Sequence, residues 1–265
     1  MNTKIKIIVI FCVVSSLLIS ACQKDNDNLT PNANLLIDYQ LKDLKGNWNS
    51  VCRIYYDSTE MISKIESVNG FNKYAYNDNK LYSITNYLES DLENYKSIIS
   101  FNYYNTGLIQ NAFILKRMGN SSDSVKIQYF NLANKTEVIT DEYSNNSVKN
   151  RITIFNWFEN NITSVENYKV ENKGEWVLIS TRKITYDNML NPLSNFGFEY
   201  DYTEISDLLS FACKNNIISI QTYNHEGDLY DQETRTYEYE NNLPVREIRV
   251  DILGKSKEFK YVYLK

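Results

Sequence analysis

Short segments of the chain alternate hydrophobic and polar residues with a period of two. Examples are residues 125–129 (VKIQY), 237–239 (YEY) and 259–263 (FKYVY). Because the side chains of a β-strand point alternately to its two faces, this pattern predicts strands with one buried and one solvated face. Clusters of Asn, Asp and Gly, as at 77–79 and 240–242, separate the segments. These residue types close hairpins, so the sequence predicts an all-β, antiparallel protein.

The predicted turns recur every 27 residues. They fall at Lys80, Gly107, Asn134, Asn161, Asn188, Asn215 and Asn242. A repeat of this length holds two strands and two connections, which is too short for the four strands of a propeller blade. Each repeat is therefore interpreted as one hairpin of an antiparallel meander. The meander is predicted to have about 14 to 16 strands between residues 51 and 264.

So many strands are expected to form a strongly curled sheet or a barrel, because an open twisted sheet of this size curls or closes. A transmembrane barrel is the rival interpretation, since its strands alternate in the same way. A mean hydropathy of -0.46 and the charges scattered through the strands oppose it.

The repeat turns are short, so we expect short connections at one end of the meander. The opposite connections, near 88–94, 117–123, 141–148 and 171–174, read as longer and more polar. Binding groups concentrate on loops, so we expect the binding surface at that second end or in the concave face beside it.

Two stretches depart from the strand pattern. Residues 34–46 place Ile37, Leu41 and Leu44 at helical spacing, and residues 203–213 (TEISDLLSFAC) also have a helical pattern. The sequence therefore predicts one or two short helices beside the sheet.

The N-terminus has the features of a secretory signal. Residues 1–6 carry two lysines, residues 7–19 are almost wholly apolar, and small residues precede Cys22. The apolar run is shorter than the roughly 20 residues that a membrane-spanning helix needs, so residues 1–21 are predicted to be cleaved. The stretch LISAC at 18–22 resembles the lipobox of bacterial lipoproteins. This resemblance implies that Cys22 is lipidated and anchors the protein to a membrane.

The residues after Cys22 indicate where the anchor faces. Gln23, Lys24, Asp25 and Asp27 resemble the acidic export signal that sends Bacteroidetes lipoproteins to the outer face of the outer membrane; a merely polar tether is the alternative. Residues 22–33 are too polar to bury and are interpreted as a flexible tether. Residues 34–265 are then expected to form a single β-meander domain.

The hairpin segments also resemble a known group of proteins. Residues 76–81 (YNDNKL) and 237–245 (YEYENNLPV) are similar to the tyrosine-rich hairpins of YD-repeat proteins. Residues 184–193 and 261–263 are similar to a Bacteroidetes lipoprotein family with an uncharacterised, DUF4595-like domain. This resemblance implies a hairpin fold, and it supplies no catalytic residue and no cofactor.

Composition excludes several functions. A net charge of -5 argues against a nucleic-acid partner, which requires a basic footprint. His225, the single histidine, excludes sites that need two imidazoles, and its setting in Asn-His-Glu-Gly-Asp predicts a solvated turn. No nucleotide-binding or nucleophile motif occurs, so neither a cofactor nor a metal is expected. Cys52 and Cys213 either form a disulfide or are two buried small hydrophobic residues.

Two functions remain. The first is a non-enzymatic binding or structural module, lipid-anchored at the outer membrane, with a glycan or an outer-membrane protein as partner. The alternative is a hydrolase of surface or dietary glycans that uses a pair of carboxylates, although the sequence shows no two that converge. Trp48 and Trp176 could offer flat faces to sugar rings, whereas Trp157 is expected to pack against the sheet.

Overall fold

The structure is a computed structural model that describes residues 35–264 apart from 89–90, 119–120, 133, 145–146, 172–174 and 195–212. All of the described residues belong to one compact unit, Asn34–Lys265. The predicted helix at 203–213 and the whole N-terminal signal and tether lie outside the described residues.

In the described part of the chain, sixteen strands follow one another. They are β1 (Leu36–Lys42), β2 (Trp48–Tyr56), β3 (Ile62–Ser67), β4 (Gly70–Asn77), β5 (Lys80–Leu88), β6 (Asp91–Tyr103), β7 (Ile109–Met118), β8 (Ser121–Leu132), β9 (Lys135–Ser144), β10 (Ser147–Phe158), β11 (Asn161–Val170), β12 (Trp176–Leu190), β13 (Asn215–Asn224), β14 (Leu229–Glu240), β15 (Leu243–Asp251) and β16 (Ser256–Tyr263).

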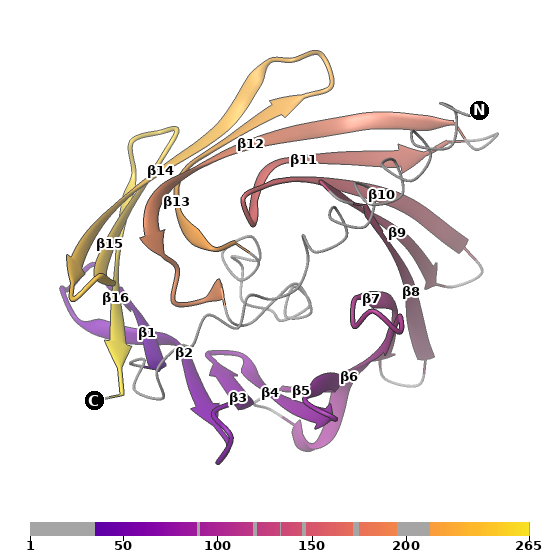
Figure 1. Ribbon diagram of the computed structural model, residues 1–265, viewed down its shortest axis with the longest axis horizontal. Coiled ribbons are helices and arrows are strands. Elements are labelled where there is room, and N and C mark those ends of the chain that lie inside the picture. Colours follow the sequence, from indigo (N-terminus) through magenta and orange to yellow (C-terminus); the bar gives the residue numbers. More distant parts are fainter. Residues whose placement is uncertain are drawn as a thin grey trace, which may run out of the picture. The chain divides into compact units, whose positions relative to one another are not determined.

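Each strand pairs with its neighbours in sequence, and β1 pairs with β16, so the sheet closes into a barrel (Figure 1). Every pairing is antiparallel, as between Tyr39 of β1 and Tyr261 of β16. The prediction of an all-β meander of curled or closed form is therefore confirmed, and the structure resolves the choice in favour of closure.

The predicted helix at 34–46 is wrong. Residues 36–42 form β1, the strand that joins the two ends of the meander. Ile37 and Leu41 fit a helical spacing, whereas Tyr39 and Leu41 fit a period of two, and hydrogen bonds to β2 and β16 decide between the two elements. The described part of the chain contains no α-helix.

Two kinds of tight turn connect neighbouring strands. Three hairpins at one end close through two residues that both have positive φ: Asp78–Asn79, Glu159–Asn160 and Asn241–Asn242. These are type I′ turns, whose twist matches that of the flanking strands and which favour Asn and Asp. We call this end the turn end.

At the opposite end, several hairpins share a turn stabilised by an Asx side chain. In one of them, Asp251 Oδ1 accepts hydrogen bonds from the amides of Leu253 and Lys255, and Gly254 adopts a φ of 75°. Asp43 and Asn224 make the same contacts in their own turns, and Asp57 makes them in the turn between β2 and β3, at the turn end. The predicted longer loops near 88–94, 117–123 and 141–148 are wrong, because the strands extend to within two residues of each other there, whereas residues 171–175 do connect β11 to β12. Most of the polar residues assigned to them extend β6, β8, β9 and β10 instead.

The 27-residue repeat has a physical basis in a bulge near the turn end of most hairpins; β8 and β9 pair without one. In β5, Leu81 faces Tyr76 while Ser83 faces Ala75, so Tyr82 is an extra residue that leaves the carbonyl of Leu81 outside the regular ladder. The hydroxyl of Tyr103, on the adjacent strand β6, donates to that carbonyl at 2.7 Å. The repeat therefore places a tyrosine on one strand opposite a bulge on its neighbour.

The same contact recurs around the barrel. The donor and acceptor pairs are Tyr56 with Leu36, Tyr76 with Ile62, Tyr186 with Ile162, Tyr237 with Ile217 and Tyr263 with Pro244. At the bulge of β7, the side-chain amide of Asn131 replaces the phenol and donates to Ile109. The abundance of tyrosine is thus explained in part by satisfaction of bulge carbonyls, which are costly to leave unpaired.

The hydrophobic core lies inside the barrel. Phe101, Ala112 and Ile127 are register partners on β6, β7 and β8, and all three are buried. Among the described residues no second layer covers the outside of the sheet, so the face whose burial continues from strand to strand is the luminal one. On β10, Ile152 and Ile154 are also buried, but their register places them on the opposite face. This assigns the inward face of every strand.

Candidate functional site

The lumen has two halves with different surroundings. Near the turn end, the inward side chains are buried hydrophobic residues such as Tyr74, Ile84 and Ile162. Sixteen-stranded barrels are wide enough to hold a channel, so burial of these side chains means that this half of the lumen is filled. We call it the closed half.

Toward the opposite end, the inward positions become polar and charged. Their assignment follows from register, because Arg151 continues the row of Ile127 and Thr140, and Arg182 faces the buried Val165. The inward charged side chains of this region that are exposed or half-buried are Lys116, Asp123, Glu142, Lys149, Arg151, Lys169, Arg182, Asp231, Glu233, Arg249, Asp251 and Lys257. Solvent therefore reaches this part of the lumen, which we call the open half.

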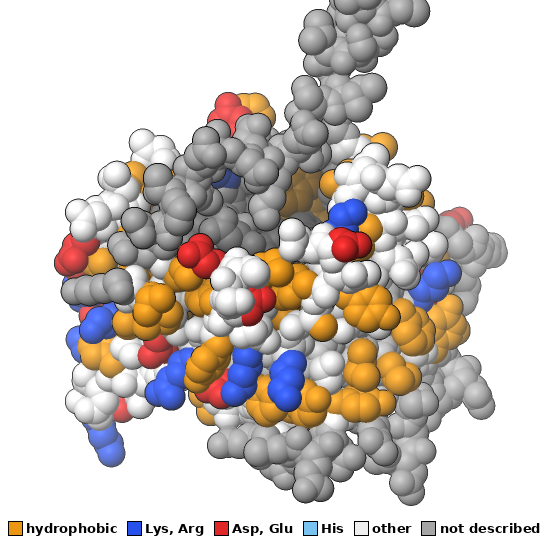
Figure 2. All heavy atoms as spheres, turned by 60° about the horizontal axis from the view of Figure 1, so that its bottom comes forward, with side chains coloured by type: hydrophobic (Ala, Val, Ile, Leu, Met, Phe, Trp, Pro, Cys, Tyr) orange, Lys and Arg blue, Asp and Glu red, His pale blue; other side chains and the backbone are white. Residues whose placement is uncertain are grey.

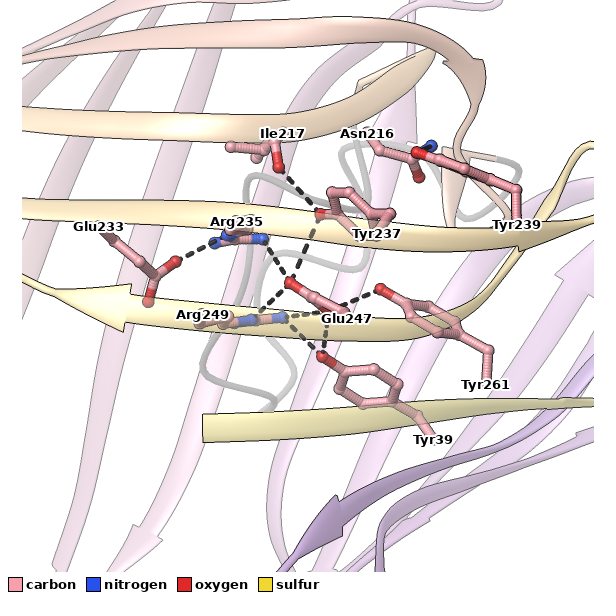
Figure 3. A network of polar contacts seen from close by, with 10 residues as sticks. All are labelled: Tyr39, Asn216, Ile217, Glu233, Arg235, Tyr237, Tyr239, Glu247, Arg249 and Tyr261. Atoms are coloured by element: carbon pink, nitrogen blue, oxygen red, sulfur yellow. Dashed lines mark hydrogen bonds and ion pairs between the residues drawn. The ribbon is translucent and has the colours of Figure 1, made fainter. Parts of the chain in front are cut away.

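A buried charge network stands at the boundary of the two halves (Figure 3). At its centre is Glu247 of β15, which is 0% exposed. One carboxylate oxygen accepts hydrogen bonds from the hydroxyls of Tyr39 and Tyr261, both at 2.7 Å, and the other accepts from Arg249 Nε at 2.6 Å. The network ties β15 to β16 and, across the closure of the barrel, to β1.

A second arginine extends the network toward the open half. Arg235 of β14 is also buried; its Nη1 lies 3.7 Å from Glu247, and its Nε donates to Glu233 at 2.6 Å. Two arginines and two glutamates thus alternate along the inner wall, so their formal charges cancel. Glu233 is the member of this chain that faces solvent in the open half.

The phenols of this network are held neutral. Burial and the nearby charge of Glu247 raise the pKa of Tyr261 and of Tyr237 well above the ordinary value. Each hydroxyl therefore remains a hydrogen-bond donor at every physiological pH. The hydrogen bonds of this network are made to the carboxylate of Glu247, a residue of the protein itself. The network therefore has a structural role.

The carboxylates of the open half do not form an available acid–base pair. Glu233 and Asp251 are register partners on β14 and β15, which is close enough for glycosidase chemistry. However, Asp251 accepts two backbone hydrogen bonds in its turn, and Glu233 binds Arg235. Both are thereby engaged in holding the barrel.

The outer wall is polar as well as hydrophobic. Figure 2 shows Lys, Arg and acidic side chains standing among hydrophobic ones on one face of the molecule. On β16, outward-facing Glu258 accepts hydrogen bonds from Arg246 Nε at 2.7 Å and Lys42 Nζ at 3.0 Å, which lower the pKa of its carboxyl. Lys64 lies over the rings of Tyr55 and Phe71 at 5.0 and 4.9 Å.

The structure places the predicted turn residues unequally. Gly107 and Asn242 lie in turns with φ of 87° and 64°, and Asn134 lies in the connection between β8 and β9. Lys80 and Asn161 are the first residues of β5 and β11, one position after their type I′ turns.

Asn188 was predicted as a turn residue, and this is wrong, because it lies within β12. The register of β12 with β13 shifts between Tyr186 and Leu190, and the connection to β13 spans residues 191–214, so this repeat unit departs from the others. It is the long connection of the barrel, and it lies at the turn end rather than at the opposite one. Cys22, Gln23, Lys24, Asp25 and Asp27 lie outside the described residues.

The remaining candidates have structural roles. Cys52 and Cys213 are free and buried, so they do not form a disulfide; burial raises the pKa of Cys52 to about 12. His225 lies in an exposed turn. Trp157 packs against the core, and its indole Nε1 donates to Thr136 at 3.1 Å. Within the described residues, no group of three or more His, Cys, Asp or Glu side chains is placed to hold a metal ion.

Sequence reasoning missed the network around Glu247. The signal was present in residues 231–237 (DQETRTY) and 247–251 (EIRVD), where charged residues occupy alternate positions. Alternation of this kind normally marks a solvated face. Only the register, which sets Glu247 opposite Tyr237 and Phe259, shows that these charges point into the barrel.

No protein-family model matches the sequence, and no curated protein matches it either. Solved structures do resemble the fold. A porin-like protein from Bacteroides vulgatus ATCC 8482 superposes with a TM-score of 0.58 at 13% identity, over 87% of this chain and 99% of that one. A porin-like protein from Bacteroides uniformis ATCC 8492 gives a TM-score of 0.53 at 10% identity, over 87% and 98% of the two chains. At these identities the likeness shows the barrel fold.

In the described residues, no helix is both long enough and apolar enough to cross a bilayer.

Proposed function

We propose that this protein is a lipid-anchored, non-enzymatic binding protein of the bacterial outer membrane whose ligand enters the open half of the barrel. One observation carries the proposal. Inward charged side chains are solvent-exposed in one half of the lumen, whereas the inward side chains of the other half are hydrophobic and buried or partly buried. A lumen that is open at one end and filled at the other holds a ligand rather than conducting one.

The outer wall supports a barrel that lies outside the bilayer. A Lys or Arg on the lipid face of a transmembrane barrel costs about 2–4 kcal/mol at the bilayer midplane. Lys64 and Lys126 project outward from β3 and β8, whose inward neighbours Ile65 and Ile127 are buried in the core. Although two porin-like proteins share the fold, this wall is better suited to water than to lipid.

The anchor is proposed to be Cys22. A diacylated N-terminal cysteine attaches a protein to the membrane without any spanning element, which agrees with a barrel whose outer wall is charged. Residues 22–33 provide the tether, because β1 begins only at Leu36. Gln23, Lys24, Asp25 and Asp27 support display on the cell surface, and the tyrosine-rich hairpins support relation to the YD-repeat and DUF4595-like lipoproteins.

The hydrolase alternative has weaker support. It requires two carboxylates that are free to exchange protons with a substrate. The closest pair in the open half, Glu233 and Asp251, is engaged by Arg235 and by turn amides. We therefore propose binding without catalysis.

Two measurements test the proposal. Metabolic labelling with an alkyne fatty acid is expected to mark the wild-type protein and not the Cys22→Ala variant; equal labelling of both would refute the anchor. In the purified protein, a charged thiol reagent is expected to modify a cysteine placed at Arg151 in the open half and to spare one placed at Ile84 in the closed half. Equal modification, or a steady conductance in planar bilayers, would show that the lumen is a through channel.

A further inference from the structure

The inner wall formed by β10, β11 and β12 carries an unusual cross-strand pair. Arg151 of β10 and Lys169 of β11 are register partners on the inward face, and both are exposed. Like charges directly opposite one another destabilise a sheet. Their juxtaposition therefore costs folding free energy and calls for a compensating role.

These cations are only partly neutralised by the protein. Lys169 binds Glu171, its neighbour at the rim, at 2.6 Å. Within the part of the chain that the structure describes, the side chains of Arg151 and of Arg182, on β12, make no ion pair and no hydrogen bond. The nearest inward acid to Arg182 in its register row is Asp231, two strands away beyond Thr222. Positive charge is left facing the lumen.

The acid on the other side of this wall is already engaged. Glu142 of β9 faces Lys149 of β10 in register. Its carboxylate lies 3.6 Å from Nζ of Lys116 on β7, with which it forms an ion pair. The inner surface from β9 to β12 therefore keeps an excess of cations.

A row of neutral polar side chains separates the cations. Thr153 Oγ1 donates to Asn167 Oδ1 at 3.2 Å, and Asn167 Nδ2 donates to Ser180 Oγ at 3.2 Å, so the row crosses β10, β11 and β12. Relative to this row, Arg151 and Lys169 lie two residues closer to the rim of the open half on their strands. Arg182 lies two residues closer to the closed half. At about 3.3 Å per residue, the two levels of cations are roughly 13 Å apart along the strands.

We propose that this basic wall, made of Arg151, Lys169, Arg182, Thr153, Asn167 and Ser180, binds an anionic oligosaccharide. Carboxylate or sulfate groups of the ligand would pair with the two levels of cations. Its hydroxyls, which both donate and accept, match the hydroxyl and amide groups between them. A ligand composed only of phosphates would leave this neutral row without a partner of its own chemistry. The inference rests on the proposed luminal binding and names its ligand class.

The test uses the full-length protein in detergent and titrates it calorimetrically with an oligogalacturonate. Length-matched neutral galactose oligomers and a polyphosphate are titrated in parallel. Oligogalacturonate is expected to bind, more weakly as salt is raised, and the R151Q/R182Q variant to bind at least ten-fold more weakly. The matched control is K126Q/K183Q, which removes the same charge from the outward face of β8 and β12 and is expected to bind like wild type.

Stability serves as an independent readout. Because Arg151→Gln removes the repulsion with Lys169, it is expected to raise the Tm of the unliganded protein. A lower Tm would contradict the claim that Arg151 is retained at a cost to folding.

The outcomes separate the two proposals. Equal binding of the neutral oligomer, with no loss in R151Q/R182Q, would leave luminal binding standing and overturn the anionic ligand. Equal affinity for polyphosphate would overturn the saccharide, and failure of all three probes would overturn the inference. The thiol-accessibility and conductance measurements judge the proposed function separately.

Discussion

Replacement of Glu247 by glutamine tests whether the buried network holds the barrel closed. The change preserves the shape of the side chain but removes the charge that compensates Arg249 and Arg235, which lie 2.6 and 3.7 Å away. Removing one partner of a buried ion pair typically costs about 3 to 5 kcal/mol, because the other charge stays buried without compensation. In a chain of this size we expect a fall in Tm on the order of 10 °C.

The comparison is with Glu258→Gln. Glu258 also binds two cations, Arg246 and Lys42, but it does so on the outer wall, where solvent screens the interaction. Urea denaturation of wild type and both variants, followed by tryptophan fluorescence, measures the free energy of unfolding. Glu258→Gln is expected to lose a small fraction of what Glu247→Gln loses. Equal losses in the two variants would refute the reasoning that burial gives the network its weight.

Two further predictions address the repeat and the thiols. Tyr103→Phe removes the phenol hydroxyl that donates to the bulge carbonyl of Leu81, and it is expected to lower the free energy of unfolding by about 1 to 2 kcal/mol. Tyr82→Phe, on the exposed outer face, is expected to leave the free energy of unfolding unchanged. If both variants unfold like wild type in urea, the proposed basis of the repeat is wrong. Cys52, whose pKa burial raises to about 12, is expected to react with Ellman's reagent only after unfolding; rapid reaction of the native protein would contradict the burial of this thiol.

Local sequence was sufficient for the strands and for much of the turn chemistry. Alternation in residues such as 125–129 depends only on which side chains face the core, so it predicted β8 without knowledge of its neighbours. The Asn and Asp residues at 78–79 and 241–242 readily adopt the positive φ that a type I′ turn needs, so they predicted these turns. The 27-residue spacing followed from the same local signals, because each unit repeats one hairpin.

The helix at 34–46 and the loop-rich end failed for a different reason. The segment 36–42 is compatible with either element, and it becomes a strand because β2 and the distant β16 both offer it hydrogen bonds. Polar residues within 117–123 and 141–148 were assigned to loops, but several of them belong to strands whose inward face lines a solvated lumen.

The sequence by itself determined that the chain is an antiparallel meander with one hairpin per repeat, because periodicity and turn propensity act over a few residues. Only the tertiary structure decided that the meander closes and which face of each strand becomes the lumen. Glu247 and Tyr39 are 208 residues apart, and their hydrogen bond exists only because β1 lies against β16. The same closure places Arg151, Lys169 and Arg182 on one inner wall, where long-range register brings together charges that the local pattern assigns to a solvated surface.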